Sequence, residues 1–396
     1  MTKNKTKKFN SGVTNKKYEE SIKLHKKHGG KLEVLSKVPL KNKNDLSLAY
    51  TPGVAGVCLA IAKNKELTRE YTLKKNTVAI VTDGTAILGL GDLGPLASIP
   101  VMEGKAAIFK NFGGVDAFPI CLDTQDTEEI IKAVKQIAPV FGGINLEDIS
   151  APRCFEIEER LRKELDIPVM HDDQWGAATV GLAALINALK LAKLKKENVK
   201  VVVAGVGAAG VATGRLLHAY GITNVIFCDS KGIINKKRMN LTKEKKELLK
   251  GSTLKERTGT LADALIDMDV FIGLSKPETL TEEMIKSMGP KPILFTLANP
   301  TPEIMPEIAH KAGAFIVATG RSDYPNQINN SLVFPNAFKA MLDYKIPQFK
   351  NEIFTTIAVA LANVVKKPNK ENIIPSMFDK KAGIAVYKAV ASLAKK

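Results

Sequence analysis

The spacing Gly-x-Gly-x-x-Gly constrains the fold of this chain most, and it occurs twice, as GLGDLG at 89–94 and as GVGAAG at 205–210. GVGAAG follows the apolar, β-branched run 199–204 and precedes the helix-like stretch 211–220. In that strand–turn–helix context, glycines let a pyrophosphate approach the N–H groups of a helix N-terminus. GLGDLG runs directly into Pro95, and we expect no helix behind it. Only the second copy therefore predicts a dinucleotide site.

An acidic residue lies where this motif needs one, because Asp229 ends the next predicted strand, 19 positions after Gly210. An Asp there hydrogen-bonds the adenosine ribose 2′-OH and favours NAD over NADP. Ser230 and Lys231 follow and could bind a 2′-phosphate, so the choice between NAD and NADP stays open. The predicted cofactor-binding residues are Gly205, Gly207, Ala208, Ala209, Gly210 and Asp229.

Two runs of alternating strands and helices predict the fold class, an N-terminal α/β catalytic domain followed by a doubly wound, Rossmann-type dinucleotide-binding domain with a helical C-terminal tail. We expect the catalytic domain at 1–160 and the cofactor domain with its tail at 161–396. The expected strands are 77–82, 117–121, 144–147, 168–171, 199–204, 225–229, 270–274, 293–297 and 315–319. Helices are expected at 105–112, 127–137, 154–164 and 176–193.

The net charge of +17 raises the question of nucleic-acid binding. Residues 1–43 hold 13 Lys against 3 Glu, and residues 231–257 hold 10 basic against 3 acidic residues. However, Lys outnumbers Arg 50 to 8, and aromatic residues that could stack bases are sparse, with Phe9 and Tyr18 in residues 1–43 and none in residues 231–257. We therefore expect a solvated, Lys-coated surface that favours anionic small substrates, with no nucleic-acid partner. A basic nucleic-acid-binding protein with a degenerate dinucleotide fold stays open as the non-enzyme alternative.

The sequence also bears on cellular location. No apolar run approaches the roughly 20 residues of a membrane span, and the Lys-rich N-terminus lacks the apolar core of a secretory signal. The four cysteines are scattered without a metal-binding spacing and are typical of reduced thiols. We expect a cytoplasmic protein with no membrane partner.

Two acidic pairs follow predicted strands, Glu147 and Asp148 in NLEDI and Asp172 and Asp173 in HDDQ. Open α/β sheets present their ligands at this end of the strands. Carboxylates without His or Cys partners suit a hard cation, Mg²⁺ or Mn²⁺. Helix capping or a surface salt bridge explains either pair taken alone, so both interpretations stay open.

Two further side chains are candidates for proton transfer. Lys105, in MEGKAAIF, begins an otherwise apolar helix, where desolvation would lower its pKa and suit a general base. The alternative is a surface lysine whose stem covers apolar residues. Tyr50, in AYTPGVAG, is either a general acid or a packed aromatic side chain.

Several segments, together and in this order, resemble the short bacterial-type malic enzymes: YTPGVAG, VTDGTAILGLGDLGPLASIPVMEGKAAIFK, NLEDI, HDDQ, ANPTPEI and TGRSDYPNQINNSLVFPN. The resemblance covers roughly residues 35 to 390. It implies oxidative decarboxylation of (S)-malate to pyruvate and CO₂ with NAD or NADP and Mg²⁺ or Mn²⁺, by a homodimer.

The resemblance also implies roles for individual residues. Lys105 corresponds to the general base, Tyr50 to the general acid and Asp172 to the partner of Lys105. The implied metal ligands are Glu147, Asp148 and Asp173. The implied substrate and nicotinamide contacts are the amides Asn299 and Asn330.

The chain departs from the pattern at Ala86, where the longer eukaryotic-type enzymes carry a malate-binding Arg. Arg321 is a candidate to bind the distal carboxylate of malate in its place. GLGDLG then belongs to the catalytic half, as a loop that approaches the substrate. Two other reactions stay open: a malolactic reaction, which retains the cofactor and releases lactate, and an amino-acid dehydrogenase reaction, which needs no divalent metal.

Overall fold

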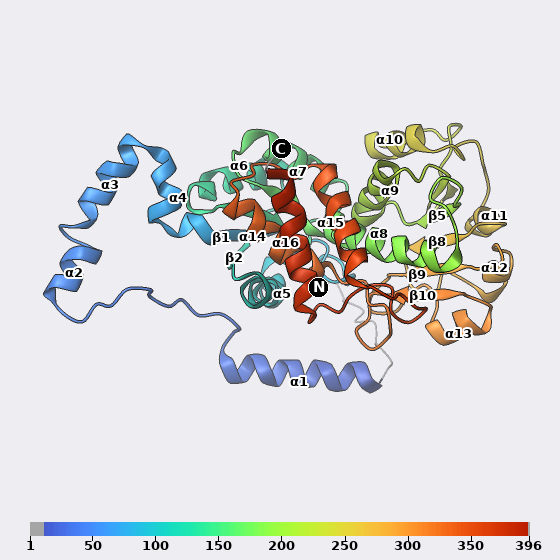
Figure 1. Cartoon of the computed structure of the whole chain (residues 1–396), viewed down its shortest axis with the longest axis horizontal. Helices are drawn as coiled ribbons and strands as arrows, with labels where there is room; N and C mark the ends of the chain where they lie inside the picture. The colour runs from blue at the N-terminus through green and yellow to red at the C-terminus, as the bar shows by residue number, and fades with distance from the viewer. Residues whose placement is uncertain (1–11, 395–396) are drawn as a thin grey trace, which may run out of the picture.

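The computed structural model describes residues 12–394 and contains two sheets (Figure 1). The first sheet has the order β2-β1-β3-β4, with all neighbours parallel. Its strands are β1 Thr77–Thr82, β2 Asp116–Cys121, β3 Gly143–Leu146 and β4 Val169–His171. The helices between them are α5 Gly94–Ile108, α6 Thr127–Ile137 and α7 Arg153–Glu164.

The second sheet has the order β10-β9-β8-β5-β6-β7, parallel except for the antiparallel pair β6–β7. Its strands are β5 Val201–Ala204, β6 Val225–Asp229, β7 Gly232–Ile233, β8 Val270–Gly273, β9 Ile293–Thr296 and β10 Ile316–Thr319. The connecting helices are α9 Ala208–Tyr220, α10 Lys243–Gly251, α11 Leu261–Leu265, α12 Glu282–Lys286 and α13 Pro306–Lys311. Since β5 lies between β6 and β8, the chain reverses direction across the sheet there, as in a doubly wound fold. The predicted fold class is confirmed.

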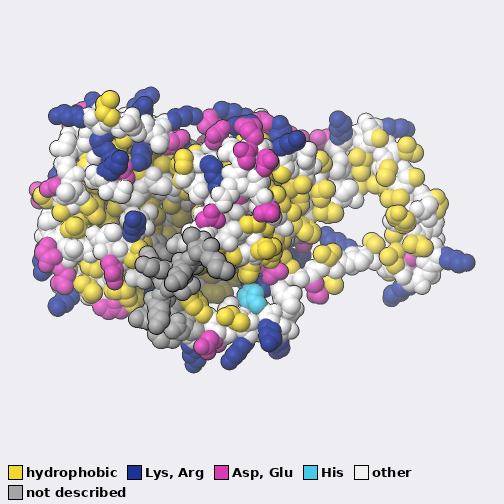
Figure 2. Space-filling model, turned by 180° about the vertical axis from the view of Figure 1, so that it is seen from behind, with side chains coloured by type: hydrophobic (Ala, Val, Ile, Leu, Met, Phe, Trp, Pro, Cys, Tyr) yellow, Lys and Arg dark blue, Asp and Glu magenta, His cyan; other side chains and the backbone are white. Residues whose placement is uncertain are grey.

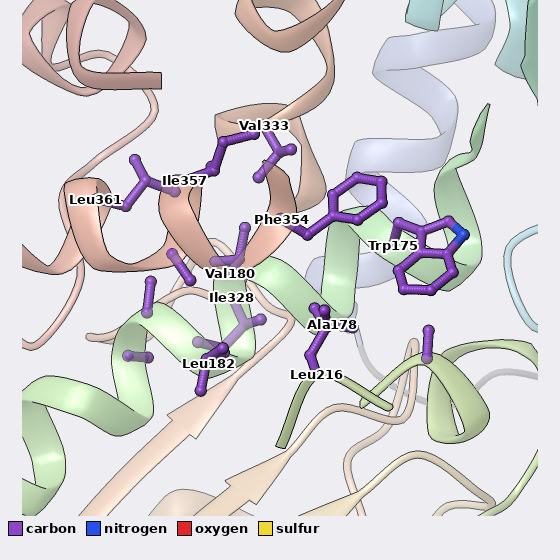
Figure 3. Packing of buried hydrophobic residues seen from close by; sticks show 14 of the residues in the cluster. Trp175, Ala178, Val180, Leu182, Leu216, Ile328, Val333, Phe354, Ile357 and Leu361 are labelled. Carbon is purple, nitrogen blue, oxygen red and sulfur yellow. The ribbon is translucent and has the colours of Figure 1, made fainter. Parts of the chain in front are cut away.

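The helix α8, Asp172–Ala192, connects the two sheets and is the main core helix. The C-terminal helices pack near it: α14 Phe334–Asp343, α15 Asn351–Val364 and α16 Lys380–Ala394. The rings of Trp175 on α8 and Phe354 on α15 stack with their centroids 4.7 Å apart (Figure 3). The predicted helical C-terminal tail therefore packs against the core helix.

Every predicted strand begins and ends within two residues of an observed one, but the helix prediction around GLGDLG is wrong. A helix does follow that loop, since α5 begins at Gly94 with Pro95 in its first turn. Proline is well tolerated there, because the first helical residues have no N–H partner to lose. Lys105 consequently lies in the last turn of α5 rather than at the start of a helix.

The expectation that no segment is long and apolar enough to span a membrane is also wrong. Within the described residues, Lys43–Lys63 and Asp172–Ala192 both reach that length and composition. Asp172–Ala192 is α8, whose apolar window is 83% buried inside the protein. Lys43–Lys63 is two helices, α2 Lys43–Ala49 and α3 Val54–Lys63, with a turn between them.

The residues before β1 include an N-terminal arm, which we define as residues 32–72. It follows α1 Gly12–His28 and contains α2, α3, the 3-10 turn η1 Lys65–Leu67 and α4 Thr68–Tyr71. The four elements contain no buried residue. In Figure 1 the arm (blue) extends away from the rest of the chain.

Replacing Asn187, which is buried on α8, tests how much the contact between this helix and the C-terminal region stabilises the fold. Its Nδ2 donates to the carbonyls of Ala362 and Ile373, both at 2.9 Å. We expect Asn187→Leu to lower the free energy of unfolding by at least about 2 kcal/mol, since each buried carbonyl left unpaired costs about 1–3 kcal/mol. The exposed Asn198 makes a matched control. Equal unfolding midpoints for Asn187→Leu and Asn198→Leu in denaturant titrations would contradict the prediction.

Candidate active site

Four carboxylates lie at one edge of the first sheet. Glu147 and Asp148 directly follow β3, and Asp172 and Asp173 directly follow β4. Because β3 and β4 are parallel neighbours, their carboxyl ends meet at this edge. One carboxylate oxygen each from Glu147, Asp148 and Asp173 lies within 4.8 Å of the others. The expected grouping of these three residues is therefore present in the fold.

The electrostatics of this group fit a divalent cation. Burial raises the pKa of Glu147 well above its usual value. Burial and then the charge of Asp173 raise the pKa of Asp148 to about 8. Among the described residues, Asp148 Oδ2 is buried without a hydrogen-bond partner. A hard cation with oxygen ligands, Mg²⁺ or Mn²⁺, would remove this repulsion and bind the free oxygen.

Lys105 reaches the same group from α5. Its Nζ lies 2.6 Å from Asp172 Oδ2 and forms a second ion pair with Glu147. The residue is 6% exposed, and its Nζ also lies 4.6 Å from the ring centroid of Phe334. Lys105 is thus a buried member of the acidic cluster, and the alternative of a surface lysine is wrong.

The expected lowering of the Lys105 pKa is also wrong. Burial does lower the pKa, but the charges of Asp172 and Glu147 together outweigh it, and the pKa of Lys105 is raised. Asn330, at the start of the 3-10 turn η5 Asn330–Leu332, donates from Nδ2 to Asp172 Oδ2 at 2.5 Å. Asp172 therefore holds both Lys105 and Asn330, as the resemblance implied for the Lys105 pair.

Behind the site, Glu158 on α7 fixes the segment that carries Asp172 and Asp173. Its carboxylate is 4% exposed and accepts from His171 N at 2.8 Å and from Gln174 Nε2 and Trp175 Nε1, both at 3.0 Å. It also pairs with Arg162 Nη2 at 2.8 Å. Sequence reasoning missed this residue, because one glutamate in a strongly charged helix carries no signal of burial.

The glycines of GVGAAG meet the demands of a dinucleotide turn. A Cβ on Gly205 would lie 2.3 Å from Leu274 O, and one on Gly210 would lie 1.9 Å from Gly205 O. A Cβ on Gly207 would meet nothing within 4 Å, so open space remains where α9 begins with Ala208 and Ala209. This geometry leaves the first N–H groups of a 13-residue helix free to receive a pyrophosphate.

Asp229, at the end of β6, is surrounded by positive charge. Arg238 binds it in a fork, with Nη1 to Oδ1 at 2.8 Å and Nη2 to Oδ2 at 2.9 Å. Lys245 Nζ lies 2.7 Å from Oδ2. Burial raises the pKa of Asp229, but the bonds from Arg238 and Lys245 outweigh it and lower the pKa. Part of the basic surplus at 231–257 is therefore engaged at the predicted ribose site.

The GLGDLG loop contacts the second sheet's loops. A Cβ on Gly89 would lie 2.7 Å from Asn299 O, and one on Gly320 would lie 2.7 Å from Asn299 Nδ2. Asn299 thus lies between the loop of the first half and the loop after β10. Arg321, also in that loop, forms a bidentate pair with Asp323, with Nε–Oδ1 at 2.9 Å and Nη2–Oδ2 at 2.6 Å. Within the described residues, no hydrogen bond or ion pair joins Arg321 to the acidic cluster.

Tyr50 is a further candidate residue that the fold does not bring to the acidic cluster. It lies on the N-terminal arm, between α2 and α3, and is 67% exposed. Its hydroxyl has no hydrogen bond to any side chain or backbone group in residues 12–394. A packed aromatic is therefore excluded within one copy of the chain.

An acidic, metal-compatible cluster with a buried lysine, next to a Rossmann-type sheet, defines a two-domain dinucleotide-binding oxidoreductase. Comparisons with known proteins narrow this class. The family model "Malic enzyme, N-terminal domain" matches residues 29–162, and "Malic enzyme, NAD binding domain" matches residues 175–394. The chain belongs to the malic enzyme family.

Relatives and solved structures agree with this assignment. The chain is 51% identical over 379 residues to the bifunctional malic/malolactic enzyme of Bacillus subtilis, covering 95% of this chain and 92% of the relative. It is 53% identical over 368 residues to the NAD-dependent malic enzyme of Geobacillus stearothermophilus, covering 92% and 77%. The crystal structure of the Thermotoga maritima NAD-dependent malic enzyme superposes with a TM-score of 0.91 at 47% identity, covering 94% of this chain and 98% of that one.

Removing one carboxylate tests whether the cluster binds a metal. We expect Asp173→Asn to weaken Mn²⁺ binding by at least about tenfold, the loss that even an outer partner of a metal ligand causes. The free Mn²⁺ signal in electron paramagnetic resonance measures it, with the exposed Asp123→Asn as control. Stability without metal should not fall, because Asp173 repels Asp148. Equal Mn²⁺ affinity in both variants would contradict the prediction.

Proposed function

We propose that this chain catalyses the oxidative decarboxylation of (S)-malate to pyruvate and CO₂ with NAD or NADP as oxidant. The observation that carries the proposal is the buried Lys105, held by Asp172 and Glu147 at the acidic edge of one sheet. The dinucleotide turn of the second sheet supplies the cofactor site. The malate-oxidising relatives at about half identity support the same reaction.

The chain's own residues account for the proton transfers. Lys105, as a neutral amine, accepts the proton of the C2 hydroxyl while C2 gives its hydride to the nicotinamide. The C3–C4 bond then breaks, CO₂ leaves, and its bonding electrons remain on the three-carbon product. Tyr50 donates the proton that C3 needs to give pyruvate. A divalent cation held by Glu147, Asp148 and Asp173 would polarise the substrate oxygens and draw negative charge away from Lys105.

Amide and guanidinium groups are proposed to bind the substrate. Asn330 is held beside Lys105 through Asp172, and Asn299 lies at the contact between the two halves. Arg321 would bind the distal carboxylate of malate in exchange for Asp323, the carboxylate it already holds.

We also propose that the enzyme is a cytoplasmic homodimer that acts without nucleic acid or membrane, with 1–160 as substrate domain and 161–396 as cofactor domain. The four free cysteines support a reducing compartment. For the cofactor, we propose that Asp229 makes NAD the preferred oxidant. Arg238 and Lys245 exceed its charge by one, and therefore let NADP bind as a weaker second choice.

Replacing Lys105 tests the proposed reaction. The wild-type chain should reduce NAD⁺ in the presence of malate and Mn²⁺, followed at 340 nm, and Lys105→Ala should be slower by about 10²–10⁴-fold. Lys110→Ala, on an exposed lysine one and a half turns further along, is the matched control and should keep the wild-type rate. An undiminished rate in Lys105→Ala would refute the proposed base.

The malolactic reaction is a second candidate, because one relative is named a bifunctional malic/malolactic enzyme. The same assay separates the two reactions through their products. Pyruvate with an equal amount of free reduced nicotinamide supports the proposal. Lactate without free reduced nicotinamide would show the malolactic reaction instead.

The charge around Asp229 gives a sharper prediction about cofactor choice. We expect Asp229→Ser to raise the NADP-to-NAD ratio of kcat/KM by at least about tenfold, since it frees Arg238 and Lys245 to bind a 2′-phosphate with charge-assisted hydrogen bonds of about 1.5–3 kcal/mol each. Adding Arg238→Ala and Lys245→Ala should abolish the gain, while adding Lys237→Ala, on an exposed neighbour, should not. Isothermal titration calorimetry gives the same comparison without turnover, from the ratio of the Kd of 2′,5′-ADP, which carries the 2′-phosphate, to the Kd of 5′-AMP, which lacks it. A gain that survives loss of both cations would contradict the prediction.

A further inference from the structure

Glu303 is a buried carboxylate to which the proposed reaction gives no role. It lies in the loop after β9 and is 0% exposed. Figure 2 shows the more usual place of charged side chains, spread over the surface of the molecule where water solvates them. A buried charge is costly unless ion pairs or hydrogen bonds compensate it. Within the part of the chain that the structure describes, Glu303 has no ion pair, and backbone N–H groups compensate its charge instead.

The two oxygens of Glu303 accept from two different loops. Oε1 accepts from Ser275 N and Oε2 accepts from Ala298 N, both at 3.1 Å. Burial raises the pKa of Glu303, and these N–H groups oppose the rise. Ser275 lies shortly after β8, and Ala298 lies shortly after β9, its parallel neighbour. One side chain therefore joins the loops that follow two adjacent strands.

Gly273, the last residue of β8, makes room for this carboxylate. A Cβ on Gly273 would lie 2.4 Å from Glu303 Cδ and 2.5 Å from Glu303 Oε1. The backbone of Glu303 is held as well, since Leu280 N donates to Glu303 O at 3.1 Å. The carboxylate therefore lies directly on the end of β8.

The loop after β8 packs against the dinucleotide turn. A Cβ on Gly205, the first glycine of GVGAAG, would lie 2.3 Å from Leu274 O and 3.0 Å from Ser275 Cβ. Ser275, whose N–H group Glu303 binds, is thus in contact with the turn that receives the cofactor. A shift of this loop would move one wall of the cofactor site.

The loop after β9 carries Asn299, the residue that directly follows Ala298. Asn299 O approaches Gly89 of the first half, and its Nδ2 approaches Gly320 in the loop after β10. The bond from Ala298 N to Glu303 fixes the backbone next to Asn299. Glu303 therefore holds both the wall of the dinucleotide turn and the segment where the two halves approach each other.

The strand order places both loops at the same end of the cofactor. β5, which leads into GVGAAG, lies between β6 and β8. Asp229, the predicted ribose ligand, is at the end of β6, so the adenosine end of the cofactor lies on that side. A dinucleotide extends across the carboxyl ends of the strands on both sides of this point. The nicotinamide end therefore extends over β8 and β9, the strands that Glu303 joins.

We propose that Glu303 is a positioning residue for the nicotinamide end of the cofactor. Its carboxylate sets the distance between the loops after β8 and β9, and through Ala298 it holds Asn299 in place. A carboxylate suits this task, because it offers two acceptor oxygens and no donor, and so takes an N–H group from each loop. The contact of Asn299 with nicotinamide and substrate rests on the proposed function, whereas the link between the loops does not.

General support of the second sheet is the competing role for Glu303. The two roles differ in their effect on the two ends of the cofactor. A residue that only stabilises the sheet affects both ends alike when it is replaced. A residue that positions the nicotinamide end spares the adenosine end, because GVGAAG and Asp229 follow β5 and β6 rather than β8 and β9.

Binding of a whole cofactor and of its adenosine fragment separates these roles. Glu303→Gln keeps the size of the side chain but turns an NH₂ group toward a backbone N–H group. In isothermal titration calorimetry we expect it to raise the Kd of NAD⁺ by at least about tenfold, the effect of losing one hydrogen bond to a charged group. The Kd of 5′-AMP, which lacks the nicotinamide end, should not change. Glu307→Gln, the same substitution at an exposed residue of α13, is the matched control and should keep both values.

Gly273→Ala is a second variant that leaves Glu303 itself intact. Its Cβ would displace the Glu303 carboxylate from the end of β8, so we expect the same selective loss of NAD⁺ affinity. Gly181→Ala on α8, where a Cβ would meet nothing within 4 Å, is the control. Unchanged NAD⁺ affinity in either Glu303→Gln or Gly273→Ala would overturn the proposal, as would equal losses of NAD⁺ and 5′-AMP affinity.

Turnover distinguishes failure of this proposal from failure of the proposed function. Glu303→Gln should lower kcat for malate oxidation by up to about 10²-fold, the effect of a displacement of about 1 Å that originates away from the reacting atoms. Its Mn²⁺ affinity in electron paramagnetic resonance should equal that of wild type, because the acidic cluster lies on the first sheet. Weaker Mn²⁺ binding would show a general defect and overturn the proposal. Wild type that binds NAD⁺ but does not oxidise malate would refute the proposed function, and the calorimetric comparison would still decide the role of Glu303.

Discussion

The buried ion pairs of Lys105 are the interaction on which the rest of the site depends. A buried ammonium is tolerated only when carboxylates compensate it closely, and here Asp172 and Glu147 do so from two different strand ends. This requirement fixes α5 against the edge formed by β3 and β4. Asn330 adds a fourth segment through Asp172, at 2.5 Å. Loss of Lys105 would leave Asp172 and Glu147 as buried carboxylates without their compensating cation.

The core helix α8 links this cluster to the cofactor half. Its first residues are Asp172 and Asp173, while its later turns are buried among the helices of the second half. Glu158 holds the start of α8 from behind, and the stack of Trp175 on Phe354 ties the same turn to the C-terminal tail. A Cβ on Gly176 would lie 2.2 Å from Asp172 Oδ1, so a larger residue there would displace the Asp172 carboxylate. The start of α8 therefore carries both the carboxylates of the site and the side chain that packs against the C-terminal tail.

Strands, glycine turn and carboxylate positions could be predicted from the sequence, because each follows from a local pattern. β-branched runs mark strands, GVGAAG has its own strand and helix, and the acidic pairs fall at strand ends. The start of α5 was missed because Pro95 breaks most helices but not their first turn. The pKa of Lys105 depends on Asp172, which lies 67 residues away in the sequence. The role of Glu158 depends on its hydrogen bond from His171, at the start of a different helix. Such pairings across the fold leave no trace in a local pattern.

The location of Tyr50 is a further limit, since the local pattern AYTPGVAG does not state where the N-terminal arm lies relative to the acidic cluster. Yet the physical demands on the site point in one direction. Proton transfer to and from a buried lysine needs a water-poor environment, while the loop and helix at its rim expose leucines to solvent. The arm exposes leucines too and carries the phenol that the site lacks. In one copy of the chain, the phenol of Tyr50 therefore lies outside the site where the proposed reaction needs a proton donor.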